Sequence, residues 1–297
     1  MTPAGAGSWS DCGCETAGKE IPRYAGADHS FDPAAACYAH RPDYPRVFYN
    51  ALRARLGPLE NGRVLDLGCG DARVALRVAR WGPEVLAVDL SAQMVSAAAG
   101  RVRGPENPGV HLLRGDAARL PFPAGTIDAV LMGQAFHWMR REWVAREVAR
   151  VLQPRGLWAV FWVQPVKPLP LPAQIADALI AEVVPGYDPD AAHDLTSKSR
   201  IPARFGFQVR TWTAEFACQY RLEDYVGMVV SKSYVAAALS AENAVEFRVR
   251  LARQLERNRL GPIVEERYLL TAYLAGRPCR PDERASVAGR GASAGQA

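Results

Sequence analysis

The sequence predicts an α/β fold in which a doubly wound, mostly parallel sheet carries helices on both faces. The first observation is the stretch 63–72, where an apolar run meets two glycines one residue apart and a helical pattern follows. The second is the alternation of strand-like and helix-like segments from there to residue 163. The third is the position of acidic and amide residues directly after several predicted strands, where such sheets bind ligands.

Each core element has its own signal. Strands are predicted at 63–67, 84–88, 110–114, 127–132 and 157–163, because these are short and mostly apolar runs. Helices are predicted between them at 72–81, after Ser91 and at 141–152, and Ser91 is the expected N-cap of the second. Gly68 and Gly70 permit a sharp turn and the close approach of a ligand, because they carry no Cβ.

The flanking segments differ in composition from this core at 61–163. Residues 1–28 and 282–297 are rich in Gly, Ala and Ser, and we expect a disordered leader and tail. Residues 29–60 are predicted to form an N-terminal helical lid. Four prolines at 165–172 then lead into a C-terminal part at 164–281, where strands at 207–217 and 264–274 enclose an amphipathic helical stretch at about 222–259.

Bulk properties exclude several classes of protein. The chain has 297 residues, 49% of them apolar, and a net charge of +5 without a dense basic run, which argues against nucleic-acid binding. No apolar run approaches the roughly 18 residues of a membrane span. The N-terminus shows no secretory pattern, so we expect a cytoplasmic protein. The six cysteines lack metal-ligand spacing, so no metal is predicted.

Several motifs resemble one family. Residues 64–70, 88–91 with Met94, and 115–122 resemble class I S-adenosylmethionine (SAM) dependent methyltransferases, and 31–45 and 134–138 resemble the same proteins. Within them the chain is similar to the small-molecule group called methyltransferase type 11, which includes trans-aconitate and quinone-biosynthesis methyltransferases. The resemblance implies a Rossmann-like sheet of seven strands with an antiparallel last strand and a helical cap between strands six and seven. Asp71-Ala72 stands where the family usually has Thr-Gly.

The resemblance implies SAM as the cofactor, and the ends of four strands supply its predicted site. Asp89 can accept both hydroxyls of a ribose, while the Asp116 carboxylate and the Ala117 N–H can bind adenine. Asp116 is alternatively the N-cap of a short turn, and Leu90 and Met94 either enclose the adenine or pack in the core. The predicted cofactor-binding residues are Tyr38, Arg41, Asp66, Gly68, Cys69, Gly70, Asp89, Leu90, Met94, Asp116, Ala117 and Gln134.

The catalytic prediction is narrower, because SAM itself carries the activated methyl group. His137 is the candidate general base, since its ordinary pKa lies near neutral pH. Alternatively, it hydrogen-bonds locally or positions Trp138. Tyr44 and Trp138 are the candidate substrate contacts.

We therefore predict methyl transfer to an oxygen, nitrogen or carbon of a small molecule by a monomer or homodimer. The arginine-rich composition suggests bacterial specialised metabolism. A cyclase or another non-methylating SAM-binding protein is the alternative. RNA methylation is disfavoured, because Gly133-Gln134-Ala135-Phe136 stands where base methyltransferases usually have Asn/Asp-Pro-Pro-aromatic.

Overall fold

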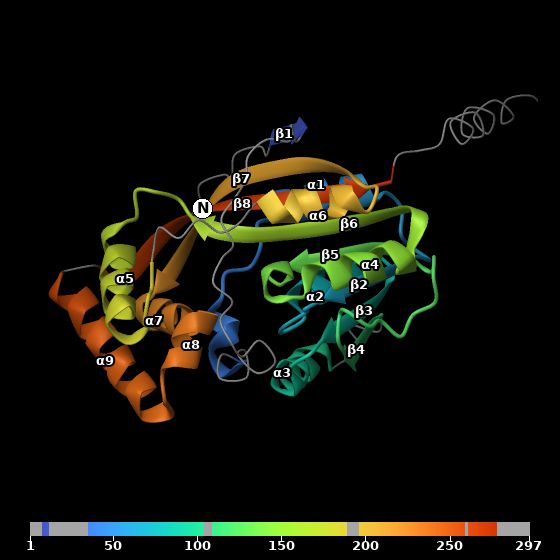
Figure 1. Ribbon diagram of the computed structural model, residues 1–297. Coiled ribbons are helices and arrows are strands. Elements are labelled where there is room, and N and C mark those ends of the chain that lie inside the picture. The colour runs from blue at the N-terminus through green and yellow to red at the C-terminus, as the bar shows by residue number, and fades with distance from the viewer. Residues whose placement is uncertain (1–7, 12–34, 104–108, 189–195, 259–260, 278–297) are drawn as a thin grey trace, which may run out of the picture.

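The computed structural model describes residues 8–11, 35–103, 109–188, 196–258 and 261–277. Within them the chain forms one mixed sheet with helices on both faces and further helices beyond one end (Figure 1). Its eight strands follow the spatial order β1-β7-β8-β6-β5-β2-β3-β4. Their bounds are β1 Ser8–Asp11, β2 Arg63–Leu67, β3 Glu84–Asp89, β4 Val110–Arg114, β5 Ile127–Gly133, β6 Leu152–Pro165, β7 Gln208–Arg221 and β8 Ile263–Gly276.

The direction of the strands confirms the predicted fold class. β2 pairs in parallel with β3 and β5, β3 with β4, and β5 with β6. β8 runs antiparallel to both β6 and β7. The seven strands β2 to β8 therefore form a doubly wound sheet with an antiparallel last strand. The carboxyl ends of β2, β3 and β5 lie together, which creates a single edge for a ligand.

β1 adds an eighth strand at the edge of the sheet. It lies inside the segment 1–28 that was predicted to be disordered, and it pairs antiparallel with residues 210–213 of β7. The rest of that segment and the predicted tail at 282–297 lie outside the described residues, as do Phe31 and Asp32.

Two sets of helices cover the sheet. α1 (Arg46–Leu56), α2 (Arg73–Ala79) and α3 (Ala92–Val102) pack on one face, and α4 (Arg141–Val151) and α6 (Thr196–Arg204) pack on the other (Figure 1). The buried residues of α4 recur at helical spacing: Val144, Ala145, Val148 and Val151. Trp158 of β6 is fully buried under α4 and α6, with its ring 5.4 Å from that of Phe136.

Four helices form a cap beyond one end of the sheet: α5 (Leu171–Val183), α7 (Leu222–Val230), α8 (Ser233–Ala238) and α9 (Ala241–Arg257) (Figure 1). The sequence predicted the stretch 222–259 as one helical run, but the chain breaks it twice. Ser240 caps α9 by accepting the N–H of Asn243 at 3.2 Å. Tyr225 of α7 donates to the buried Glu266 of β8 at 2.8 Å, which ties the cap to the sheet.

The N-terminal lid is less regular than predicted. Residues Ala35–His40 form a 3-10 helix, η1, and α1 begins only after Pro42 and Pro45. Tyr38, Arg41 and Tyr44 therefore do not share the face of one helix. η1 packs between α7 of the cap and α3 of the core.

Candidate cofactor and active site

The turn after β2 is left-handed at three alternate positions. The backbone angle φ is 68° at Gly68, 54° at Gly70 and 60° at Ala72. A Cβ on Gly68 would lie 2.5 Å from the Cβ of Ala135, so only glycine fits there. A Cβ on Gly70 would lie 3.1 Å from the ring of Tyr38. The turn is therefore bare backbone, with Ala135 on one side and an aromatic ring on the other.

Asp89 lies directly beside this turn. Its Oδ2 accepts the N–H of Gly70 at 2.9 Å, and its Oδ1 accepts the N–H of Ser91 at 2.9 Å. The carbonyl of Val88 accepts the N–H of Cys69 at 3.1 Å. The structure thus brings together two features that the sequence separates by about twenty residues, the glycine turn and the carboxylate expected to bind ribose. Each carboxylate oxygen has two lone pairs, so Asp89 keeps acceptor capacity for a ligand.

Asp66 is deeper than the prediction implied. Its side chain is buried, and its Oδ2 accepts the N–H of Ala75 in α2 at 3.1 Å. Burial raises the pKa of this carboxyl to about 7, against the opposing effect of the Ala75 N–H. Asp66 therefore fixes α2 against β2 behind the turn. Cys69 is also buried, and burial raises the pKa of its thiol well above the usual value.

Asp116 follows β4 and uses both carboxylate oxygens within the protein. Oδ1 accepts the N–H of Ala118 at 2.8 Å, and Oδ2 accepts from Arg140 at 2.9 Å. The first bond is the turn-capping role that the sequence allowed. The side chain is 44% exposed, so a ligand can still reach it, and the neighbouring Ala117 is buried.

Leu90 and Met94 lie in different environments. Leu90, next to Asp89, is 43% exposed, which is high for a large apolar side chain at a strand end. Met94 in the first turn of α3 is buried and packs with Ala236 of α8 and with Tyr38. Leu90 therefore offers an open apolar face beside Asp89, whereas Met94 supports the site from inside.

Tyr38 and Arg41 lie where the lid meets the turn. The Arg41 guanidinium carbon is 5.3 Å from the centre of the Tyr38 ring, and that of Arg73 is 5.5 Å from it. Burial raises the pKa of Tyr38, against the opposing effect of the two arginines. Arg41 donates to the hydroxyl of Ser231 at 2.8 Å and to its carbonyl at 2.6 Å. Arg41 thus joins the lid to the cap.

Tyr44 reaches the carboxyl end of β5. Its side chain is 8% exposed, and a Cβ on Gly133 would lie 2.6 Å from its hydroxyl oxygen. Its ring packs edge-on against Phe161, with the ring centres 4.9 Å apart. Burial raises its pKa well above the usual value, so the hydroxyl stays protonated. No hydrogen bond joins this hydroxyl to another residue of the described part of the chain. This hydroxyl is therefore available to a ligand at the end of β5.

Gln134 has a left-handed backbone, with φ of 55°, which is uncommon for a residue other than glycine. Its N–H donates to the carbonyl of Phe161 at 2.8 Å, and its side-chain nitrogen donates to the carbonyl of Val163 at 3.0 Å. Two hydrogen bonds to β6 therefore fix the strained backbone of Gln134 at the carboxyl end of β5.

His137 and Trp138 lie in the 3-10 turn η2 (Phe136–Trp138), directly after Ala135, which contacts the glycine turn. The centres of their rings are 5.0 Å apart at an angle of 43°. Both side chains are half-buried. The structure therefore brings η2 to the same edge of the sheet as Gly68 and Asp89.

Sequence reasoning missed Asp71 and Arg73 as site residues. The Asp71 side chain is 4% exposed and that of Arg73 is 11% exposed. Arg73 binds Asp71 and also three backbone carbonyls of the lid. The only signal was the departure from Thr-Gly at Asp71-Ala72, which places a charge where the family usually has a hydroxyl.

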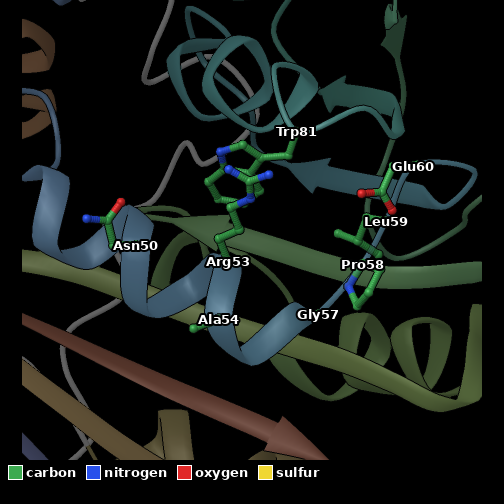
Figure 2. A pocket seen from close by; sticks show the side chains of 8 residues that line it. All are labelled: Asn50, Arg53, Ala54, Gly57, Pro58, Leu59, Glu60 and Trp81. Carbon is green, nitrogen blue, oxygen red and sulfur yellow. The ribbon is translucent and has the colours of Figure 1, made fainter.

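A surface pocket of about 490 Å³ lies elsewhere (Figure 2). It is lined by residues of α1, by the turn 57–60 before β2 and by Trp81 after α2. The turn 57–60 precedes β2 and Trp81 precedes β3, so the pocket opens at the amino ends of these strands, opposite the glycine turn. It is not the site described above.

Among the residues that the structure describes, no group of three or more His, Cys, Asp or Glu side chains is arranged to hold a metal ion. None of the helices described is both long and apolar enough to span a bilayer.

The fold and the site can now be compared with those of known proteins. Residues 65–160 match the family model described as "Methyltransferase domain". An uncharacterised methyltransferase of Schizosaccharomyces pombe is 32% identical over 41% of this chain and 47% of its own. The chain spans about half the length of the curated relatives it matches.

Two solved structures show the same fold. Phosphoethanolamine N-methyltransferase 2 of Haemonchus contortus, solved with phosphomonomethylethanolamine and S-adenosylhomocysteine, aligns with a TM-score of 0.52 and 16% identity over 87% of this chain and 62% of its own. The [4+2]-cyclase SpnF aligns with a TM-score of 0.52 and 17% identity, over 87% of this chain and 97% of the cyclase chain. At these identities the likeness concerns the fold alone.

Proposed function

We propose that the protein is a SAM-dependent methyltransferase that acts on a small molecule. The observation that carries the proposal is the bond from Gly70 N–H to Asp89, which places a carboxylate beside a bare glycine turn at the carboxyl edge of the sheet. A family model for methyltransferase domains matches the same residues.

The residues present fit such a cofactor. Asp89 would accept the ribose hydroxyls, and the exposed face of Leu90 would cover one side of the adenine. Asp116 and the Ala117 N–H would bind the edge of the ring. The Tyr44 hydroxyl, which finds no partner among the described residues, supports a polar ligand at the end of β5, where Gln134 would hold the methionine part. When bound, SAM supplies an activated methyl group.

The chain itself would then position the acceptor and exclude water. The N-terminal lid packs between α7 and α3, and Ala236 of α8 packs with Met94 and Tyr38. We propose that the cap selects the substrate. Holding two reactants in line contributes on the order of 7–11 kcal/mol in favourable cases. His137 would remove a proton only from a hydroxyl or an acidic carbon, and Trp138 would line the acceptor site.

A cyclase is the second candidate, because the fold is shared with a [4+2]-cyclase. The two functions differ in their products, since only methyl transfer adds a methyl group and releases S-adenosylhomocysteine. A cytoplasmic location, a monomeric or homodimeric state and a role in bacterial specialised metabolism belong to the proposal on sequence grounds alone.

The first test is calorimetry of SAM and S-adenosylhomocysteine with the wild type and with Asp89→Ala. We expect the wild type to bind both ligands. The variant should bind at least about tenfold more weakly, because it loses the ribose acceptor and the bond that orders Gly70. Acceptor mixtures are then incubated with SAM, and products are analysed by mass for the added methyl group.

The matched control is Glu84→Ala, which removes a carboxylate from the opposite end of the same strand. It should bind both ligands like the wild type. Equal weakening in both variants would show a general loss of stability. Binding without a methylated product, but with a cyclised one, would favour the second candidate.

A further inference from the structure

Arg73 makes an unusually complete set of hydrogen bonds at the start of α2. Its Nη1 donates to the carbonyls of Arg41 at 2.7 Å and Pro42 at 2.8 Å. Its Nη2 donates to the carbonyl of Tyr38 at 2.9 Å. Nε and Nη2 each donate to one oxygen of Asp71 at 2.9 Å. All five N–H donors of the guanidinium are therefore used, three of them on the backbone of one short segment.

Asp71 orients this guanidinium. The pair is nearly buried, and the two parallel bonds fix the plane of the arginine. Arg101 of α3 also binds Oδ2 of this carboxylate. The charge of Asp71 therefore offsets the cost of burying Arg73, and the pKa of Arg73 is raised because this pairing outweighs desolvation.

The segment that Arg73 holds, residues 38–42, covers the glycine turn. The Tyr38 ring lies against Gly70, and Arg73 fixes the carbonyl of the same tyrosine. The other side of the segment contacts the cap, through Arg41 on Ser231 and His40 on Asp224 at 3.2 Å. Arg73 thus bonds the segment to the core beside the glycine turn.

We propose that Arg73 is a positioning residue for cofactor binding, oriented by Asp71, which holds residues 38–42 closed so that Tyr38 covers the ligand side of Gly70. This inference rests on the function proposed above. It also gives a reason for the Asp71-Ala72 departure, because an aspartate at this position supplies two of the five acceptors that Arg73 bonds. Without Arg73, three lid carbonyls lose their donors and the segment is free to open.

The test compares wild type, Arg73→Gln and the control Arg80→Gln in two measurements. Arg80 lies exposed at the other end of α2 and makes no bond to the segment in the described structure. Calorimetry with S-adenosylhomocysteine should show at least about tenfold weaker binding in Arg73→Gln and no change in the control. Amide hydrogen exchange should be faster at 38–44 in Arg73→Gln alone, with exchange in β2 and β5 unchanged.

A double-mutant cycle with Tyr38→Ala separates positioning from general support of the fold. If Arg73 acts through Tyr38, the two losses of affinity should not add. The double variant should then bind S-adenosylhomocysteine as tightly as whichever single variant has the lower affinity. Fully additive losses would overturn the proposal, as would binding by Arg73→Gln within about twofold of the wild type. If Arg73→Gln does not fold, Asp71→Asn keeps the shape of the pair and is judged by the same two measurements.

Failure of the two proposals can be told apart. If the wild type binds neither SAM nor S-adenosylhomocysteine, the proposed function fails. The exchange rates at 38–44 then decide alone whether Arg73 holds the segment. If the wild type binds and the arginine variant binds equally well, only the positioning role fails.

Discussion

At the scale of single residues, Ala72 is the clearest conflict between sequence and backbone. It is fully buried with φ of 60° and ψ of 22°, a conformation that costs a residue with a Cβ about 1–2 kcal/mol. Glycine would avoid this cost but would lose a buried methyl group and gain entropy in the unfolded chain. The opposing effects are similar in size.

We therefore expect Ala72→Gly to change the free energy of unfolding by less than about 1 kcal/mol. Ala75→Gly is the matched comparison, because Ala75 is equally buried but lies in regular helix. Ala75→Gly should lower the free energy of unfolding by about 1–2 kcal/mol, because glycine has a lower helix propensity and lacks the buried methyl group. Urea denaturation of both variants measures the difference. Equal losses would mean that the left-handed turn does not strain Ala72.

At the scale of elements, the contact between η1 and α7 depends on a helical glycine. A Cβ on Gly227 would lie 2.5 Å from Cδ2 of His40, whose ring rests on the helix while its Nδ1 bonds Asp224. The glycine therefore lowers the intrinsic stability of α7 in order to admit the lid.

In an isolated helix, replacing glycine by alanine stabilises the helix by about 1 kcal/mol. Gly227→Ala should not show this gain, because the new methyl group displaces His40 and separates η1 from the cap. The control is Gly100→Ala in α3, where a Cβ would meet nothing within 4 Å and the full gain is expected. Thermal unfolding and limited proteolysis of residues 38–44 measure both effects. Stabilisation by Gly227→Ala with unchanged proteolysis would contradict this account.

At the scale of the whole molecule, Asp66 links global stability to pH. The carboxyl pKa rises from its ordinary value of 3.8, which we take for the unfolded chain, to about 7 in the fold, chiefly through burial. Between these values the native state binds more protons than the unfolded state, so stability falls as pH rises from about 4 to 7 and is level above that. The free energy of unfolding falls by at most about 4 kcal/mol over this range, since each unit of pKa difference corresponds to roughly 1.4 kcal/mol.

Asp66→Asn should remove this pH dependence and keep an acceptor for the Ala75 N–H. We expect the melting temperature of the wild type to fall, relative to that of the variant, between pH 5 and 7.5. Asp128→Asn, at the amino end of the sheet, serves as the control and should follow the wild type. Parallel curves for wild type and Asp66→Asn would show that Asp66 stays ionised in the fold.

The sequence predicts the central sheet well, because its signals are local. β2 and β4 have the predicted bounds, and α4 differs by one residue. The cap was predicted less well, since one long amphipathic pattern cannot show that the chain turns at Ser231 and Ser240. Periodicity also says nothing about a side chain that bonds carbonyls some thirty residues away, so the role of Arg73 needed the structure. The pairing of Gly70 with Asp89 was expected only because known strand-end geometry connects them.

The place of β8 has a consequence for how the chain matures during synthesis. β8 is the last strand of the sheet in sequence, yet it lies between β6 and β7. Until the ribosome has released it, β6 has an unpaired edge, and β7 with its partner β1 has no bond to the rest of the sheet. The nascent chain therefore presents open strand edges until β8 has been synthesised, and these edges can pair with other chains. The sheet is complete only once β8 has inserted between β6 and β7.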